Sequence, residues 1–191
     1  MKKLLAFTLI FFSTISIINA EEIKRIFVGN KDAKITIIVF ESLTCSHCAN
    51  FHKDVYPQLK KEYLDTGLAK IEFRHFPLDI AAFNASKVSQ CKNDGDSGIL
   101  NSLFANQQKW VKGNSVEEAN KNLQKFLTSE GFDLNFEKCI NNKEIEDFVL
   151  NDRIDGVKNF KVNATPTIII NNKKFEKSLN YKNLKKALEK L

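Results

Sequence analysis

Two of the four cysteines form a C-x-x-C motif, Cys45-Ser46-His47-Cys48, at the point where an apolar run gives way to a helical pattern. In the first turn of a helix, Cys45 lies near unpaired backbone N–H groups and the positive end of the helix dipole. Both favour thiolate over thiol, and His47 could add a hydrogen bond or a positive charge. Cys48 falls on the apolar face and is expected to be shielded. The motif therefore predicts a redox-active pair in which Cys45 is the nucleophile and Cys48 resolves the mixed disulfide.

Two other kinds of site use the same motif. Cys45, Cys48 and His47 could bind zinc, but the chain has no second C-x-x-C pair, and its other His and Cys residues are not at ligand spacing. A purely structural disulfide within the motif would close too short a loop to stabilise the fold much. We favour the redox-active interpretation, in which the Cys45–Cys48 disulfide is itself the redox group and no metal or other cofactor is expected.

The hydrophobic pattern predicts the elements that hold this motif. Residues 35–40 are β-branched and nearly all apolar, which predicts a central strand covered on both faces. From Thr44, a plausible N-cap, apolar residues recur every three or four positions until Gly67 ends the helix. Pro57 falls inside this helix and is expected to kink it. A second apolar run at residues 68–73 completes a strand–helix–strand unit, which implies parallel pairing.

The rest of the chain divides into a helical stretch and a short return to strand. Residues 78–160 show only helical periods, and strand character returns at residues 167–170. Asn171-Asn172 is typical of a tight turn, and an amphipathic helix closes the chain. The prediction is an α/β fold interrupted by an all-helical insertion, with residues 21–77 and 161–191 forming the split α/β unit and residues 78–160 the insertion.

Residues 1–20 have the layout of a secretory signal peptide. Lys2 and Lys3 precede an apolar run that reaches Ile18, and Ala20 offers a small residue for cleavage. An apolar region of about 15 residues is short for a helix that spans a bilayer, so cleavage is favoured over a retained anchor. We expect export to the periplasm, where the four cysteines meet an oxidising environment.

The composition is that of an ordinary globular protein. Of 191 residues, 43% are hydrophobic and 27% charged, with 7 Gly and 3 Pro, which argues against a disordered, collagen-like or low-complexity chain. The net charge of +6 is mild and dispersed along the sequence. It does not indicate a nucleic-acid partner.

Four segments of the chain together match a known pattern: residues 40–48, 56–59, 73–78 and 164–167. They resemble the DsbA-like thiol:disulfide oxidoreductases of the thioredoxin superfamily, and the likeness covers nearly all of the chain after residue 20. The resemblance implies a thioredoxin-like fold with an inserted helical domain. It also implies a cis peptide bond before Pro166, in a loop that lies against the active-site disulfide. Thr165 and Pro166 would then offer a backbone edge to an extended substrate. The alternative is an ordinary trans proline that opens an edge strand.

The resemblance further implies a function and partners. DsbA-like proteins introduce disulfides into newly exported, unfolded proteins, and a quinone-linked membrane oxidase reoxidises them. Disulfide isomerases and reductases use the same motif, but they commonly carry an N-terminal dimerisation domain. Because only about 14 residues separate the predicted cleavage site from the first predicted strand, we favour a monomeric oxidase. A non-catalytic, chaperone-like peptide-binding protein is a further alternative.

The chain departs from the family pattern at two places. Many members have an acidic residue six positions before the first active-site cysteine, where this chain has Val39. Glu41, two residues on, is either a replacement for it or a solvated residue at the strand end. Many members also have proline at the position of Ser46, whereas the His47 that is kept favours an oxidising pair.

The remaining cysteines and histidines fall outside the motif. Cys91 and Cys139 lie on two predicted helices of the insertion and are either two buried thiols or one structural disulfide. Export favours the disulfide, whose loop would contribute roughly 4 kcal/mol in the chain-entropy model. His52 and His75 are expected to be surface or capping residues.

Overall fold

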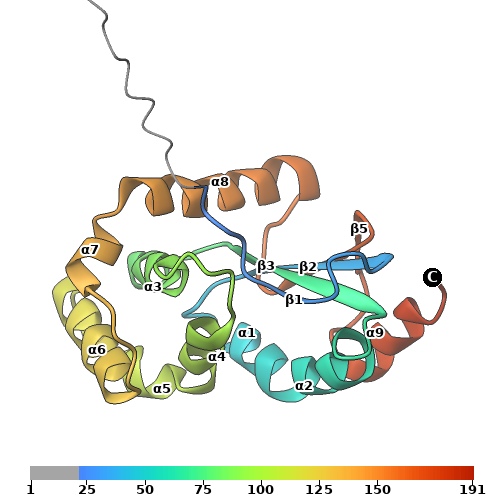
Figure 1. Cartoon of the computed structure of the whole chain (residues 1–191), viewed down its shortest axis with the longest axis horizontal. Helices are drawn as coiled ribbons and strands as arrows, with labels where there is room; N and C mark the ends of the chain where they lie inside the picture. Colours follow the sequence, from blue (N-terminus) through green and yellow to red (C-terminus); the bar gives the residue numbers. More distant parts are fainter. Residues whose placement is uncertain (1–21) are drawn as a thin grey trace, which may run out of the picture.

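The fold places a central sheet between helices on both faces. The computed structural model describes residues 22–191, so the predicted signal peptide lies outside the described residues. Figure 1 shows α8 (Lys143–Phe160) above the sheet, and α1 (Ser46–Asn50), α2 (Tyr56–Leu59) and α9 (Tyr181–Leu188) below it. The other helices gather beside one end of the sheet.

Five strands form the sheet, in the order β1-β3-β2-β4-β5. They are β1 (Phe27–Gly29), β2 (Ile35–Glu41), β3 (Ala69–His75), β4 (Thr167–Ile170) and β5 (Lys173–Lys174). β2 and β3 run parallel, which confirms the predicted strand–helix–strand unit, and the other neighbours are antiparallel. Asn171 and Asn172, between β4 and β5, have φ values of 45° and 65°, as the predicted tight turn requires. The edge strand β1 is only three residues long and leaves no periodic signal in the sequence.

The helix that carries the cysteine motif contains two π-helical segments. Between Ser46 and Leu64 it consists of α1, the segment η1 (Phe51–Val55), α2 and the segment η2 (Lys60–Leu64). Pro57 lacks a backbone N–H, and its ring crowds the carbonyl four residues earlier. Wider turns relieve that crowding, and the crowded carbonyl, that of Lys53, lies in the π-helical segment η1. A kink at Pro57 stays a prediction.

The N-cap predicted at Thr44 is wrong, because the N-cap position of α1 is Cys45. The Thr44 hydroxyl instead donates to Oδ2 of Asp79 at 2.7 Å, and Asp79 caps the helix α3 (Ile80–Gln90). This bond ties together the starts of two helices. It also leaves α1 without a side-chain cap, so its first backbone N–H groups stay available to the Cys45 sulfur.

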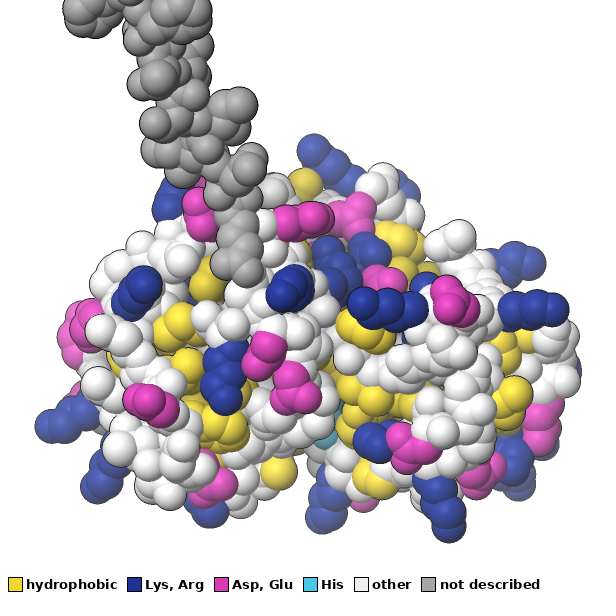
Figure 2. Space-filling model, viewed as in Figure 1, with side chains coloured by type: hydrophobic (Ala, Val, Ile, Leu, Met, Phe, Trp, Pro, Cys, Tyr) yellow, Lys and Arg dark blue, Asp and Glu magenta, His cyan; other side chains and the backbone are white. Residues whose placement is uncertain are grey.

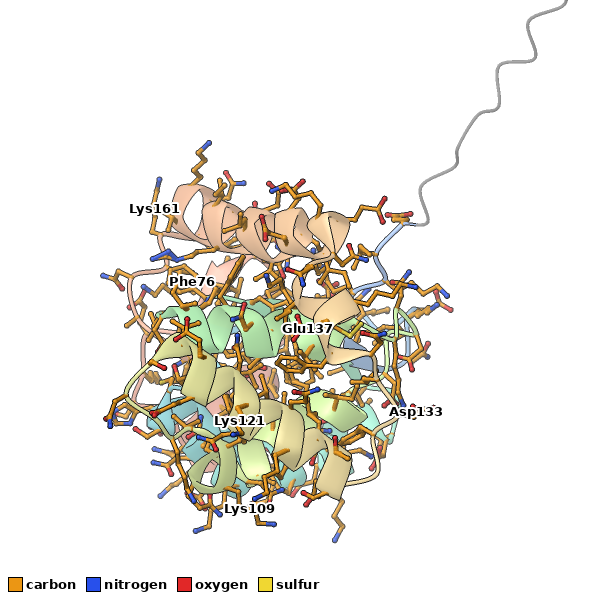
Figure 3. The ribbon with its side chains drawn as sticks, turned by 90° about the vertical axis from the view of Figure 1, so that its left-hand side faces the viewer. Phe76, Lys109, Lys121, Asp133, Glu137 and Lys161 are labelled. Atoms are coloured by element: carbon orange, nitrogen blue, oxygen red, sulfur yellow. A yellow bond between two sulfur atoms is a disulfide. The ribbon has the colours of Figure 1, made fainter. Side chains whose placement is uncertain are left out.

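The stretch from residue 78 to residue 160, which is described throughout, contains helices and no strand, as predicted. Besides α3 and α8, these helices are α4 (Gly98–Ala105), α5 (Gln107–Trp110), α6 (Val116–Ser129) and α7 (Phe136–Ile140). α8 lies against the sheet rather than with the others, and Figure 3 shows Phe76 beneath its C-terminal end. A Cβ at Gly156 would meet the Phe40 ring at 2.9 Å, so glycine is what lets α8 approach this closely.

Two apolar clusters cover the two faces of the sheet. The larger is built on Ile37, Val39 and Phe73 and extends through the motif helix into the insertion. The smaller contains Phe40 and four other residues and lies under α8. β2 is therefore buried on both faces, as its apolar run predicted, and this rigid strand ends four residues before Cys45.

Candidate active site

Cys45 lies in the turn between β2 and α1, and a side chain from the insertion holds that turn. Nε2 of Gln107, on α5, donates to the carbonyl oxygens of Leu43 at 2.7 Å and of Cys45 at 3.0 Å. The Cys45 carbonyl also accepts the first bonds of α1 from the N–H groups of Cys48 and Ala49, so the glutamine adds a further donor there. Its bond to the Leu43 carbonyl, which lies outside the sheet ladder, supplies a donor that the loop backbone needs. The position of the reactive turn therefore depends on both parts of the fold.

The Cys45 sulfur is partly exposed and lies among hydrogen-bond donors. The Cys48 thiol, the Thr165 side chain and the backbone N–H groups of Cys48 and His47 all favour the thiolate, and they outweigh desolvation. Together they lower the pKa of Cys45 to about 5. As a thiol, Cys45 donates to the Thr165 carbonyl oxygen at 3.4 Å. Cys45 is therefore suited to be a thiolate at neutral pH.

Cys48 has the opposite environment although it lies three residues away. Its side chain is fully buried, and burial is the largest cause of the rise in the pKa of its thiol. Its hydrogen bond to Cys45 and the negative charge of Glu41 raise that pKa further. One thiol of the pair thus stays protonated while the other ionises.

The contribution of His47 to Cys45 comes from its backbone N–H. The imidazole is exposed, and within the described residues it has no hydrogen bond to the Cys45 sulfur. Support of the thiolate by the ring charge stays a prediction.

The loop before β4 meets the cysteine motif from the far end of the chain. The peptide bond between Thr165 and Pro166 is cis, so the alternative of an ordinary trans proline is wrong. Both residues border a groove of about 520 Å³, which His47, Phe51 and Tyr181 also line. The structure therefore brings Cys45, His47, Thr165 and Pro166 to one surface.

Glu41 lies buried behind Cys48, with 2% of its surface exposed, so the solvated alternative is wrong. Its Oε2 lies 2.8 Å from Nε2 of His52, whose side chain is 6% exposed. The other oxygen, Oε1, has no hydrogen-bond partner within residues 22–191. Val39, two residues earlier on the same strand, is a core residue.

The prediction that His52 and His75 lie on the surface or act as caps is wrong. The His52 ring stacks on Phe104 with centroids 4.1 Å apart. His75 is 1% exposed, its Nε2 lies 3.2 Å from Oε1 of Gln90, and burial lowers the pKa of its imidazole. The sequence held a signal for both: His75 follows Phe73 at strand spacing, and His52 follows Cys48 at helical spacing.

Cys91 and Cys139 form a disulfide that joins the end of α3 to α7. The alternative of two free thiols is therefore wrong. The bond connects residues 48 positions apart and lies within the insertion, away from the sheet.

The described residues contain neither a metal-ligand cluster nor a membrane-spanning helix. Nowhere in residues 22–191 do three or more His, Cys, Asp or Glu side chains gather in an arrangement that could hold a metal ion. Over the same residues, no helix has both the length and the apolar character needed to cross a bilayer.

The family comparison matches almost the whole chain. A family model described as thioredoxin covers residues 21–190. The chain belongs to this thioredoxin family. Within the family it is DsbA-like: its structure superposes on the crystal structure of alpha-DsbA1 from Wolbachia pipientis with a TM-score of 0.76 and 29% identity, covering 87% of this chain and 90% of that one. The predicted thioredoxin-like fold with a helical insertion is thereby confirmed.

The curated relatives of this thioredoxin-family chain have names that refer to disulfide chemistry. A putative protein-disulfide oxidoreductase of Rickettsia bellii is 29% identical over 148 residues, which cover 75% of this chain and 56% of the relative. Disulfide bond formation protein D of Bacillus subtilis is 27% identical over 175 residues, covering 85% and 75%. The chain thus spans little more than half the length of the Rickettsia relatives, between 52% and 60% for three of them.

Proposed function

We propose that the protein is an exported thiol:disulfide oxidoreductase that introduces disulfide bonds into secreted or periplasmic proteins. The observation that carries this proposal is the difference between two neighbouring thiols: the pKa of Cys45 is lowered to about 5, and that of Cys48 is raised. Surroundings that stabilise a thiolate stabilise the reduced pair, which makes its disulfide a stronger oxidant. The names of the curated relatives support the same activity.

The reaction begins with the Cys45–Cys48 pair as a disulfide. A substrate thiolate attacks the Cys45 sulfur, a mixed disulfide forms, and the Cys48 sulfur leaves and takes up a proton, as its raised pKa favours. A second substrate thiolate then attacks the substrate sulfur of the mixed disulfide, and Cys45 leaves as a stabilised thiolate. The substrate has lost two electrons and gained a disulfide, and the protein holds those electrons as a dithiol.

The Thr165-Pro166 loop is the proposed substrate edge. The Thr165 carbonyl oxygen lies 3.4 Å from the Cys45 sulfur, so a peptide joined to Cys45 passes beside this backbone. Proline has no N–H to offer, which leaves the carbonyl of Thr165 as the acceptor for an extended chain. Unfolded proteins are the fitting substrates, because their backbone is free to pair.

Export and reoxidation complete the proposed cycle. Residues 1–20 would direct the chain to the periplasm, and a quinone-linked membrane oxidase would return the pair to its disulfide form. The protein would act as a monomer with the Cys45–Cys48 pair as its redox group and without another cofactor. Sequencing the N-terminus of the protein recovered from the periplasm tests the export step.

The reduction potential of the pair is the test of the oxidase proposal. Mature protein is equilibrated in glutathione buffers, and the thiolate of the same sample is titrated by its ultraviolet absorbance. We expect a potential well above the value of about −270 mV typical of thioredoxin. A potential like that of thioredoxin would overturn the oxidase proposal in favour of a reductase or isomerase. A pair that does not cycle, with peptide binding that survives Cys45→Ala, would indicate a peptide-binding protein.

A further inference from the structure

A second hollow lies on the other side of α1 from the Thr165-Pro166 loop. It has a volume of about 900 Å³ and lies between the motif helix and the pair α4 and α5. Ala49 and Pro57 form one wall, and Phe104, Ala105 and Val111 form the other. The hollow therefore has apolar walls, and it is large enough for bulky side chains.

This hollow opens directly beside the reactive cysteine. Ser46, the residue after Cys45, lines it, and so does Gln107, whose amide bonds to the Cys45 carbonyl oxygen at 3.0 Å. Asn50 lines both this hollow and the groove beside Pro166. A peptide joined to Cys45 therefore has one hollow on each side of its sulfur.

The lysine and aspartate side chains that line the two hollows differ in the sign of their charge. The charged residues that line the larger one are Lys53 and Lys60, and within residues 22–191 no Asp or Glu lines it. Lys60 is paired with Asp65, whereas Lys53 is exposed and has no ion pair within the described residues. The charged residue lining the groove beside Pro166 is Asp54.

The face of the molecule shown in Figure 2 does not share this separation. On the face shown in Figure 2, Lys and Arg side chains are interspersed with Asp and Glu. The hollow is therefore a local feature. Lysines border it, apolar side chains form its walls, and the reactive sulfur lies next to it. Its lysines fit a carboxylate, and its apolar walls fit an apolar or aromatic side chain.

We propose that the hollow bordered by Lys53 and Lys60 is a substrate subsite that takes an acidic, apolar segment next to the cysteine being oxidised. This inference rests on the proposed function and adds a substrate preference to it. The segment would place its apolar side chain against Val111, which is exposed, and its carboxylate near Lys53, while the chain on the other side of the cysteine would follow the Thr165-Pro166 backbone. The protein would then select among unfolded substrates by the residues beside their cysteines.

The test compares peptides that differ only in charge. Each peptide carries two cysteines and one Phe, with Glu or Lys beside the first cysteine, placed on its N-terminal side in one pair and on its C-terminal side in the other. The kcat/KM for oxidation is measured for each peptide. We expect the Glu peptide of one pair to be oxidised about three- to five-fold faster, because exposed ion pairs are modest. Equal rates within both pairs would overturn the proposal.

Two variants connect this preference to the hollow. Lys53→Glu is expected to remove or reverse the ratio of the Glu to the Lys peptide, and Ala105→Trp, which fills the hollow, is expected to bring the ratio close to one. Lys158→Glu is the matched control, because Lys158 is exposed on α8, on the opposite face of the sheet. A ratio within one variant does not depend on how much of that variant is folded.

The outcomes separate this inference from the proposed function. If Lys53→Glu and Lys158→Glu change the ratio equally, or neither changes it, the subsite is overturned even though oxidation proceeds. If the wild-type protein oxidises none of the peptides and does not oxidise reduced glutathione either, the proposed function fails.

Discussion

The two cysteine pairs of this protein lie at opposite kinds of helix end. Cys45 is the N-cap of α1, where free N–H groups face its sulfur, and its pKa is lowered to about 5. Cys91 is the C-cap of α3, and Cys139 lies in the last turn of the short helix α7, where the backbone presents carbonyl oxygens. A thiolate is stabilised at the first kind of end and destabilised at the second. The Cys45–Cys48 pair is therefore suited to thiol–disulfide exchange, and the Cys91–Cys139 pair is suited to a permanent disulfide.

Removing the nucleophilic sulfur of the first pair, or both sulfurs of the second pair, gives the largest contrast. Cys45→Ala is expected to reduce oxidation of a dithiol peptide to the uncatalysed rate, because it removes the nucleophile, and Cys48, the other free thiol among the described residues, is buried. The double variant Cys91→Ala/Cys139→Ala is expected to keep the wild-type rate within about two-fold, since that bond takes no part in the exchange. Peptide oxidation followed by mass spectrometry measures both. A loss of exchange in the double variant would show that the two pairs act together.

The stability of the double variant gives the second contrast. Removing Cys91–Cys139, whose ends are 48 residues apart, is expected to lower the free energy of unfolding by about 2–4 kcal/mol. Urea denaturation with the Cys45–Cys48 pair kept in one redox state measures this loss. Reducing the Cys45–Cys48 pair in the wild-type protein is expected to have no such cost. A double variant as stable as wild type would contradict a structural role for the second disulfide.

The pH dependence of the reduced protein gives the third contrast. The folded-state pKa of Cys45, about 5, lies below the ordinary thiol value of about 8.5. The thiolate therefore stabilises the folded reduced protein fully above about pH 8.5, and this contribution is lost as the pH falls through about 5. The stability of the reduced sample in thermal unfolding, relative to the oxidised one, should fall steadily between these two pH limits, whereas the thiolate absorbance of the folded reduced protein should fall only near pH 5. If the absorbance titrates near the ordinary thiol pKa instead, the contrast between the helix ends is wrong.

The smallest expected effect comes from the buried acid behind the motif. The negative charge of Glu41 raises the pKa of Cys48, so Glu41→Gln is expected to bring that pKa closer to its ordinary value while keeping the shape of the side chain. This is checked by the pH dependence of the rate at which the Cys48 thiolate attacks the Cys45 sulfur of a mixed disulfide and releases the substrate thiol. Glu137→Gln on α7 is the control, and an equal response in both variants would contradict a specific effect of Glu41.

The sequence predicted what depends on local pattern. The period of the apolar residues marked β2, β3 and the motif helix, and the position of Cys45 at the junction indicated a reactive thiol. The sequence did not predict the environment of the charged and polar groups behind it. The bond between Glu41 and His52 depends on which face of the strand meets which face of the helix, and Thr44 bonds to Asp79, which is 35 residues away. Such partners follow from tertiary packing, and no local period encodes them.

The two bonds from Gln107 make the helical insertion part of the reactive turn. A version of the protein without α4 and α5 would keep every strand of the sheet, because neither helix contributes a strand, but it would lose the part of the larger apolar cluster that Leu103 and Trp110 supply. It would also lose the amide that donates to the Leu43 and Cys45 carbonyl oxygens. The Cys45 carbonyl would keep its bonds from the first N–H groups of α1, whereas the Leu43 carbonyl would lose its donor. A designer who reduces this fold to its sheet and motif helix must therefore supply a new donor for the Leu43 carbonyl as well as a new cover for the apolar cluster.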